Sequence, residues 1–171
     1  MNKPEYIIIH HTGGTDLNPK ADTSYQTMEI IDAWHQEKEF TISSLGWYCG
    51  YHYVIERDGK LRQARQEYEE GVHTIEYNKR SIGVCLIGNF DSFLPTKEQI
   101  LSLKILLREL VEKYKMKTEF IIPHRHFANK TCFGKKLYDL WGQDVYKLSL
   151  LEKLVYLYQK VVELIIISEK K

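Results

Sequence analysis

Uninterrupted apolar segments occur at three places along the chain. They are EYIIIHH at residues 5–11, SIGVCLIGNF at residues 81–90 and the shorter TEFIIPH at residues 118–124. A continuous run rich in Ile and Val is typical of a strand that is covered on both faces of a sheet. We therefore predict a strand at each place, with His10 and His11 closing the first and His124 at the end of the last.

Apolar and polar residues alternate in YHYVIERDGKLRQAR at residues 51–65, on both sides of Asp58-Gly59. This dipeptide favours the tight turns that join antiparallel strands, because Asp and Gly tolerate the positive φ angles that such turns need. The segment is therefore predicted to form a β-hairpin.

Helical spacing of apolar residues appears in two longer segments. In YQTMEIIDAWHQEKE at residues 25–39, Met28, Ile31 and Trp34 fall near one face, and Ser24 is expected to cap the helix. The segment at residues 96–115 opens with the capping-box spacing of Thr96 and Gln99, and its apolar stripe comprises Ile100, Leu103, Leu106, Leu107, Leu110 and Val111. Strands that alternate with helices predict an α/β fold with a central mixed β-sheet and helices on both faces.

Residues 144–171 are predicted to form an extra C-terminal amphipathic helix behind a domain of residues 1–143. Its apolar residues recur at intervals of three and four, and charges such as Glu152, Lys153 and Lys160 interrupt any membrane span. We expect the helix to pack on the same domain. The alternatives are a dimerisation helix, which would give a homodimer, and a membrane-associating helix, since the ending LIIIS is unusually apolar for a surface terminus.

Composition adds few constraints. The 171 residues are 43% hydrophobic and 27% charged with a formal net charge of +1, which gives no support for nucleic acid or an anionic membrane as partner. Three scattered cysteines, Cys49, Cys85 and Cys132, are too few for a disulfide framework and indicate synthesis in a reducing compartment. The N-terminus MNKPEYIIIHHT lacks the apolar core and cleavage site of a signal peptide, so we expect cytoplasmic synthesis.

Candidate metal ligands lie at two predicted strand ends. His10 and His11 end the first strand, and PHRHFANKTCFG at residues 123–134 supplies His124, His126 and Cys132. Imidazole and thiolate are the donors that zinc prefers, and the ends of neighbouring strands lie side by side in an α/β sheet. Because adjacent strand residues point to opposite faces, we expect one histidine of each pair to face a common site with Cys132.

Three protein ligands leave a fourth position open, which is the pattern of catalytic rather than structural zinc. The alternative is a core histidine and a buried free thiol without any metal.

Four segments in order resemble the zinc-dependent N-acetylmuramoyl-L-alanine amidases of type 2. They are IIIHHT, WHQEKEF with GWYCGYHYVIERDGKL, GVHTIEYNKRSIGVCLIGNF and PHRHFANKTCFG, and the similarity covers residues 6–140. This family shares its fold with the peptidoglycan recognition proteins and includes short phage endolysins. The resemblance implies a catalytic domain of residues 1–143 with one Zn²⁺ per chain, which hydrolyses the amide between N-acetylmuramic acid and L-alanine in peptidoglycan.

The resemblance also implies individual roles. Zinc would be held by His10, His124 and Cys132 and would activate a water molecule. Tyr51 falls at the family's active-site tyrosine and would orient that water. Lys130 stands two residues before the cysteine, where endolysin-like members carry a catalytic lysine, and would stabilise the oxyanion.

Further positions are expected to touch the substrate or to separate the branches of the family. His73, in GVHT, belongs to a segment that lines the family's groove, and His11 and Asn78 are further expected substrate-binding residues. Cys85 stands where the cytosolic recycling amidases carry a glutamate. This departure indicates the endolysin-like branch.

We therefore expect a cell-wall lytic enzyme of the phage or prophage endolysin type, which acts on peptidoglycan after release from the cytoplasm. A cytosolic muropeptide-recycling amidase is the first alternative, and Cys85 disfavours it. A non-catalytic peptidoglycan-binding module is the second. Members of the fold that only bind characteristically lose the cysteine ligand, whereas this chain has Cys132.

Overall fold

The computed structural model describes residues 3–141 and, in the C-terminal part, residues 152, 154–155, 157–158 and 161–162. Its strands are β1 (Tyr6–His11), β2 (Tyr53–Ile55), β3 (Leu61–Gln63), β4 (Ser81–Leu86) and β5 (Ile121–Pro123). Its α-helices over residues 3–141 are α1 (Met28–Glu37), α2 (Lys97–Tyr114) and α3 (Lys135–Leu140). Short 3-10 helices cover Asn78–Arg80, Thr118–Phe120 and His124–His126.

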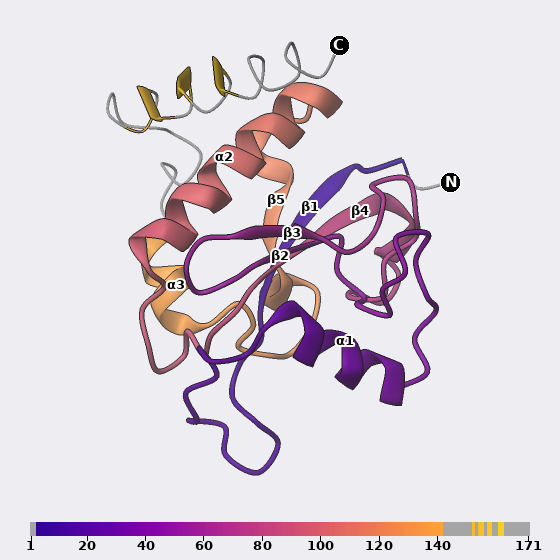
Figure 1. Ribbon diagram of the computed structural model, residues 1–171, viewed down its shortest axis with the longest axis vertical. Coiled ribbons are helices and arrows are strands. Elements are labelled where there is room, and N and C mark those ends of the chain that lie inside the picture. The colour runs from indigo at the N-terminus through magenta and orange to yellow at the C-terminus, as the bar shows by residue number, and fades with distance from the viewer. Residues whose placement is uncertain (1–2, 142–151, 153, 156, 159–160, 163–171) are drawn as a thin grey trace.

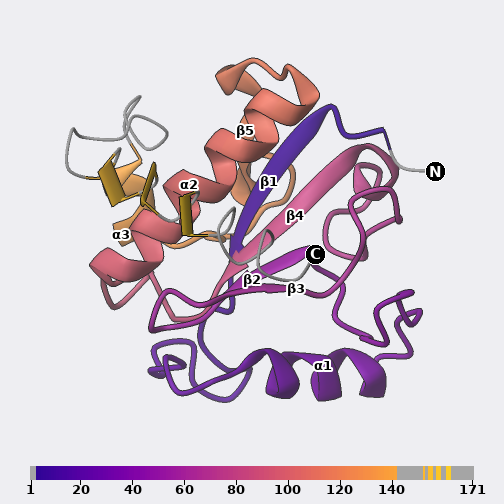
Figure 2. The ribbon, with the colours of Figure 1, turned by 45° about the horizontal axis from the view of Figure 1, so that its top comes forward.

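The strands form one mixed sheet in the order β3-β2-β4-β1-β5. β1 lies between β4 and β5 and is parallel to both, and β2 is parallel to β4 but antiparallel to β3. α2 and α3 pack on one face of this sheet and α1 packs on the other (Figures 1 and 2). The predicted α/β fold with a mixed sheet and helices on both faces is therefore confirmed.

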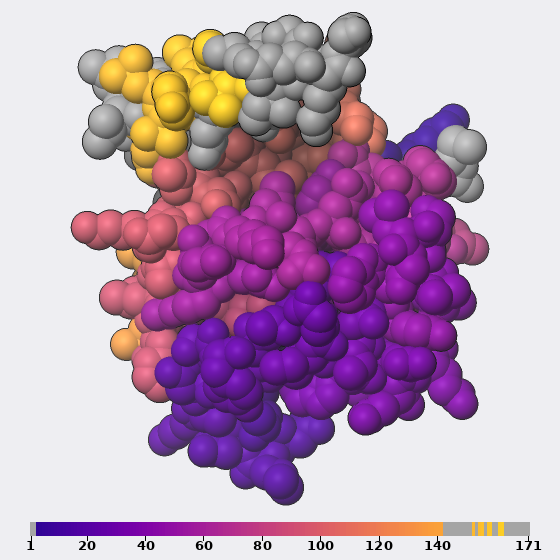
Figure 3. Space-filling model, in the orientation of Figure 1, coloured from indigo at the N-terminus to yellow at the C-terminus, as the bar shows by residue number. Residues whose placement is uncertain are grey.

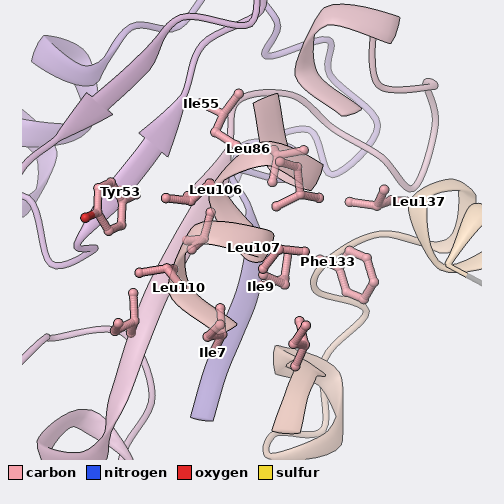
Figure 4. Close-up of a cluster of buried hydrophobic side chains, with 14 of the residues drawn as sticks. Ile7, Ile9, Tyr53, Ile55, Leu86, Leu106, Leu107, Leu110, Phe133 and Leu137 are labelled. Carbon is pink, nitrogen blue, oxygen red and sulfur yellow. The ribbon is translucent and has the colours of Figure 1, made fainter. Parts of the chain in front are cut away.

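The main hydrophobic core lies between the sheet and α2. Ile7 and Ile9, alternate residues of β1, point into this core together with Phe133 and Leu137, which follow β5 in the sequence (Figure 4). Four residues of the predicted α2 stripe are at most 2% exposed, namely Leu103, Leu106, Leu107 and Leu110. β1 and the residues after β5 therefore pack in the same core against α2, which stabilises their positions relative to each other.

Two local predictions are confirmed in detail. Gly59 adopts a φ of +87°, and β2 and β3 pair in antiparallel register on either side of the turn that it forms with Asp58. At the start of α2, the Thr96 hydroxyl accepts the Gln99 N–H and the Gln99 side chain accepts the Thr96 N–H, which completes the capping box.

The start of α1 differs from the prediction. The N-cap position is occupied by Thr27 and not by Ser24. Residues 23–26 form a turn instead, because the Thr23 hydroxyl donates to the Gly13 carbonyl at 2.6 Å and the Gln26 N–H donates to the Thr23 carbonyl. The prediction that Ser24 caps this helix is therefore wrong.

The buried face of α1 also differs from the prediction. It consists of Met28, Ile31 and His35, whereas Trp34 is 38% exposed. The spacing i, i+3, i+7 lies closer to one helical face than the predicted i, i+3, i+6. Trp34 therefore lies outside the core, and His35 takes its place.

The loop between β1 and α1 projects from the lower part of the molecule (Figures 1 and 3). In the C-terminal part, the described residues are helical, and Lys104 of α2 forms an ion pair with Glu152 at 2.9 Å. Four of these residues are more than half exposed, namely Leu154, Leu157, Tyr158 and Val161. Most of the predicted helix at 144–171 lies outside the described residues, so its packing and the homodimer stay predictions. Across the helices that the structure describes, none combines the length and the apolar character that crossing a membrane requires.

Candidate functional site

A groove of about 920 Å³ opens beside the carboxyl ends of β1 and β5. The loop after β1, the α1 residues Trp34 and His35, and the segment from Lys130 to Cys132 all contribute to its lining. His10, Tyr51 and other predicted site residues lie along the same groove, so it collects side chains from distant parts of the sequence.

The strand register brings the predicted ligands together. Ile9 pairs with Pro123, so the residues that follow, His10 and His124, stand side by side with ring centroids 4.4 Å apart. Cys132 reaches them from the loop after β5, with its Sγ 3.8 Å from His10 Nδ1. One donor atom from each of the three residues lies within 4.8 Å of the other two.

The chemistry of these side chains fits a zinc ion. Nδ1 of His124 is buried and has no hydrogen-bond partner in the described part of the chain, which is costly unless a cation binds it. Burial lowers the pKa of His10 well below its ordinary value and that of His124 to about 4, so both rings are neutral, the form that binds metal. Burial raises the pKa of the Cys132 thiol to about 12, and a cation beside the sulfur would favour the thiolate instead.

Hydrogen bonds behind His10 fix the orientation of its ring. Its Nε2 lies 3.1 Å from His73 Nδ1 and 3.4 Å from Thr74 Oγ1. Nε2 of His73 in turn lies 3.5 Å from the Ser81 hydroxyl, which donates to the Tyr77 carbonyl at 2.7 Å. A proton on His10 Nε2 leaves its Nδ1 lone pair available to a metal, and contacts of this kind orient metal-binding histidines.

The second histidine of each pair lies outside this group of three donors. His11 is 7% exposed and its Nδ1 accepts the Phe90 N–H at 3.0 Å, while its ring stacks on Phe90. His126 is exposed and is absent from the donor group. His10 and His124 are the members of the two pairs that lie close to Cys132, and their role as ligands stays a prediction.

The predicted substrate-binding residues have well-defined surroundings. His73 and His11 both line the groove. The Asn78 side-chain oxygen accepts the N–H groups of His73 and Thr74 at 2.9 and 2.8 Å, so Asn78 holds this segment in place. Contact of His73, His11 and Asn78 with a substrate stays a prediction.

The two predicted catalytic residues lie in the same groove as the candidate ligands. The Tyr51 ring is centred 5.1 Å from the His10 ring. Burial, together with the nearby thiols, raises the pKa of Tyr51 well above its ordinary value, so the hydroxyl remains a donor at neutral pH. Lys130 is an exposed groove residue whose charge contributes, after burial, to the lowered pKa of His124.

Sequence reasoning missed two groove residues. His35 accepts the Gly50 N–H at 3.0 Å and stacks on Phe40, and the i, i+7 spacing from Met28 could have placed it on the buried face. Asp91 accepts hydrogen bonds from the segment that carries Lys130 and Cys132, as described below. Its only sequence signal is a carboxylate shortly after a predicted strand.

Comparisons with known proteins agree with this geometry. The chain is 36% identical over 122 residues to the endolysin of Escherichia phage T7, covering 67% of this chain and 74% of the endolysin. It is 31% identical over 140 residues to peptidoglycan-recognition protein SC2 of Drosophila melanogaster, covering 81% and 72% of the two chains. Among solved structures, N-acetylmuramoyl-L-alanine amidase LysC from Clostridium intestinale matches with a TM-score of 0.65 and 28% identity over 79% of each chain.

The model of the N-acetylmuramoyl-L-alanine amidase family matches residues 1–135. This range includes both catalytic candidates and all three predicted ligands, together with every strand of the described sheet. The chain therefore belongs to the N-acetylmuramoyl-L-alanine amidase family.

Proposed function

We propose that this protein hydrolyses the amide between N-acetylmuramic acid and L-alanine in peptidoglycan, with one zinc ion held by His10, His124 and Cys132. The observation that carries the proposal is the convergence of these three donors at the groove, where His124 Nδ1 has no hydrogen-bond partner among the described residues. When bound, zinc supplies a Lewis acid that polarises the amide carbonyl and lowers the pKa of water.

The residues around the ligands support distinct roles. The Lys130 ammonium is exposed to the groove, so it can stabilise negative charge that develops on the carbonyl oxygen. The protonated Tyr51 hydroxyl is a neutral donor beside His10 and orients the reacting groups. His73 keeps the proton of His10 on Nε2, which leaves Nδ1 for the metal.

We further propose that the enzyme acts on the cell wall after release from the cell, as an endolysin does. The similarity to the phage T7 endolysin over two thirds of this chain supports this role. The similarity to a peptidoglycan-recognition protein makes binding without cleavage the contrasting outcome. The presence of Cys132 in the donor group favours cleavage over binding alone.

Digestion of purified sacculi tests the proposed reaction. The protein should release new N-terminal alanine, detected by mass spectrometry, and a chelator should abolish the release while zinc restores it. The chelated protein should keep its circular-dichroism spectrum, because the hydrophobic core does not depend on a metal. Binding to sacculi without any new alanine terminus would rule out the amidase and leave a recognition module.

Replacement of Lys130 by alanine should separate catalysis from metal binding. We expect Lys130→Ala to retain one zinc per chain and to cleave about 100- to 1000-fold more slowly, the typical effect of removing one donor to an oxyanion. Lys117→Ala is the matched control, since this side chain is 77% exposed and does not line the groove. Cleavage by Lys130→Ala at the rate of the control would exclude Lys130 from the mechanism.

A further inference from the structure

We propose that Asp91 is a positioning residue that holds the loop bearing Lys130 and Cys132 against the segment that follows β4, and so sets where the Cys132 sulfur meets the two histidines. The inference rests on the proposed function, since it concerns the same metal site. Asp91 itself is not part of the donor group.

Each oxygen of the Asp91 carboxylate accepts one hydrogen bond from the loop. The Thr131 hydroxyl donates to Oδ2 at 2.7 Å, and the Lys135 N–H donates to Oδ1 at 3.0 Å. These two donors flank Cys132 on either side in the sequence. One side chain therefore fixes both ends of the short segment that presents the thiol.

The same segment lies directly on the backbone that precedes Asp91. The Lys136 N–H donates to the Phe90 carbonyl at 2.8 Å. Gly134 has a φ of +88°, and a Cβ placed on it would lie 2.4 Å from the Phe90 carbonyl carbon. This close approach leaves no room for a side chain, so the loop is seated on Phe90 and Asp91 rather than held at a distance.

A third group reaches Asp91 from β1. Nδ1 of His11 accepts the Phe90 N–H, so a neutral His11 ring carries its proton on Nε2. That Nε2 lies 4.0 Å from Asp91 Oδ2. Asp91 thus stands between the strand that supplies His10 and the loop that supplies Cys132.

Residues that do not bind the metal themselves can still hold its ligands in place, and the contacts of Asp91 are of this kind. Groups that orient ligands typically change metal affinity by about 10- to 100-fold when they are removed. Because Thr131 lies between Lys130 and Cys132, a loosened loop would misplace both the candidate oxyanion donor and the thiol. We therefore expect loss of Asp91 to weaken zinc binding and to slow cleavage.

The test uses the full-length protein and zinc alone as the probe. Competition with a chromophoric chelator should show that Asp91→Ala binds zinc about 10- to 100-fold more weakly than the unmodified protein. Thr131→Val removes one of the two bonds and should weaken binding less, while Thr131→Ser keeps the hydroxyl and should restore it. Asp139→Ala, an exposed aspartate on α3, is the matched control.

A second readout is independent of zinc. In the metal-free protein, the Cys132 thiol of Asp91→Ala should react faster with a thiol-specific reagent, because the loop that bears it is no longer held to Asp91, while Cys49 and Cys85 stay buried. Faster labelling without any zinc binding by the unmodified protein would support the positioning role and overturn the proposed metal site. Unchanged labelling and unchanged zinc affinity in Asp91→Ala and Thr131→Val would overturn the positioning role alone.

Discussion

Cys132→Ala is expected to lose zinc and to reduce cleavage of peptidoglycan by at least about a thousandfold. Two histidines alone leave the ion with too few protein donors, and the missing thiolate is the only anionic ligand of the three. Polarisation of the carbonyl by a metal supplies several kcal/mol of transition-state stabilisation, and each 1.36 kcal/mol corresponds to a factor of ten in rate. Elemental analysis of the purified variant and release of N-terminal alanine provide the two measurements.

Cys49→Ala is a suitable control for this experiment. Cys49 is a fully buried free cysteine that packs with α1 and does not line the groove. This variant should keep one zinc per chain even if it is somewhat less stable. One zinc per chain together with normal cleavage in Cys132→Ala would contradict the proposed ligand set.

Acid should destabilise the metal-free protein between about pH 6.5 and pH 4. Burial lowers the pKa of His35 and of His52 to about 4, from an ordinary value of 6.5. Each ring accepts a backbone N–H at Nδ1, from Gly50 and from Gly83 respectively, so protonation would also break that hydrogen bond. Both rings are therefore held neutral in the folded state.

The sign of the effect follows from proton binding. Well above pH 6.5 neither state binds a proton at these rings, and the contribution of the two rings to the free energy of unfolding is at its full value. Between pH 6.5 and 4 the unfolded chain binds more protons than the folded protein, so this free energy decreases as the pH falls. For each histidine, the pKa difference between 6.5 and about 4 lowers the free energy of unfolding by about 3 kcal/mol once the pH reaches the pKa of the folded state.

Urea unfolding at a series of pH values, with chelator present, measures this loss. His52→Gln keeps an acceptor for the Gly83 N–H but does not titrate, so its free energy of unfolding should depend less steeply on pH. His126→Gln removes an exposed histidine and serves as the control for the substitution itself. A free energy of unfolding that stays constant from pH 7 to pH 4.5 would refute the neutral state of these rings.

Much of the site follows from local patterns because strand geometry is simple. Alternation along β1 sends Ile7 and Ile9 into the core and places His10 and His11 on opposite faces. The sequence therefore predicts that one of the two histidines faces a common site, and the family resemblance implies that it is His10. The capping box at Thr96 and the turn at Gly59 depend only on neighbouring residues. These predictions needed no knowledge of tertiary contacts.

Other features depend on contacts that no local pattern contains. The start of α1 is decided by the bond from Thr23 to Gly13 across the loop, which competes with capping by Ser24. The parallel register of Ile9 with Pro123, which selects His124, is a long-range pairing. The role of Asp91 depends on a loop that returns to it more than 40 residues later in the chain, and its own neighbours carry no sign of that contact.

The position of β1 between β4 and β5 links the proposed metal site to the order in which the chain is made. His10 and Cys132 are 122 residues apart in the sequence, yet their donor atoms lie 3.8 Å apart. His10 is on β1, with which both β4 and β5 pair. A nascent chain that has emerged only as far as β4 carries one of the three proposed ligands. On the proposed ligand set, we therefore expect hydrolytic activity only after β5 and the loop behind it have been made, and chains truncated before Cys132 should not cleave peptidoglycan.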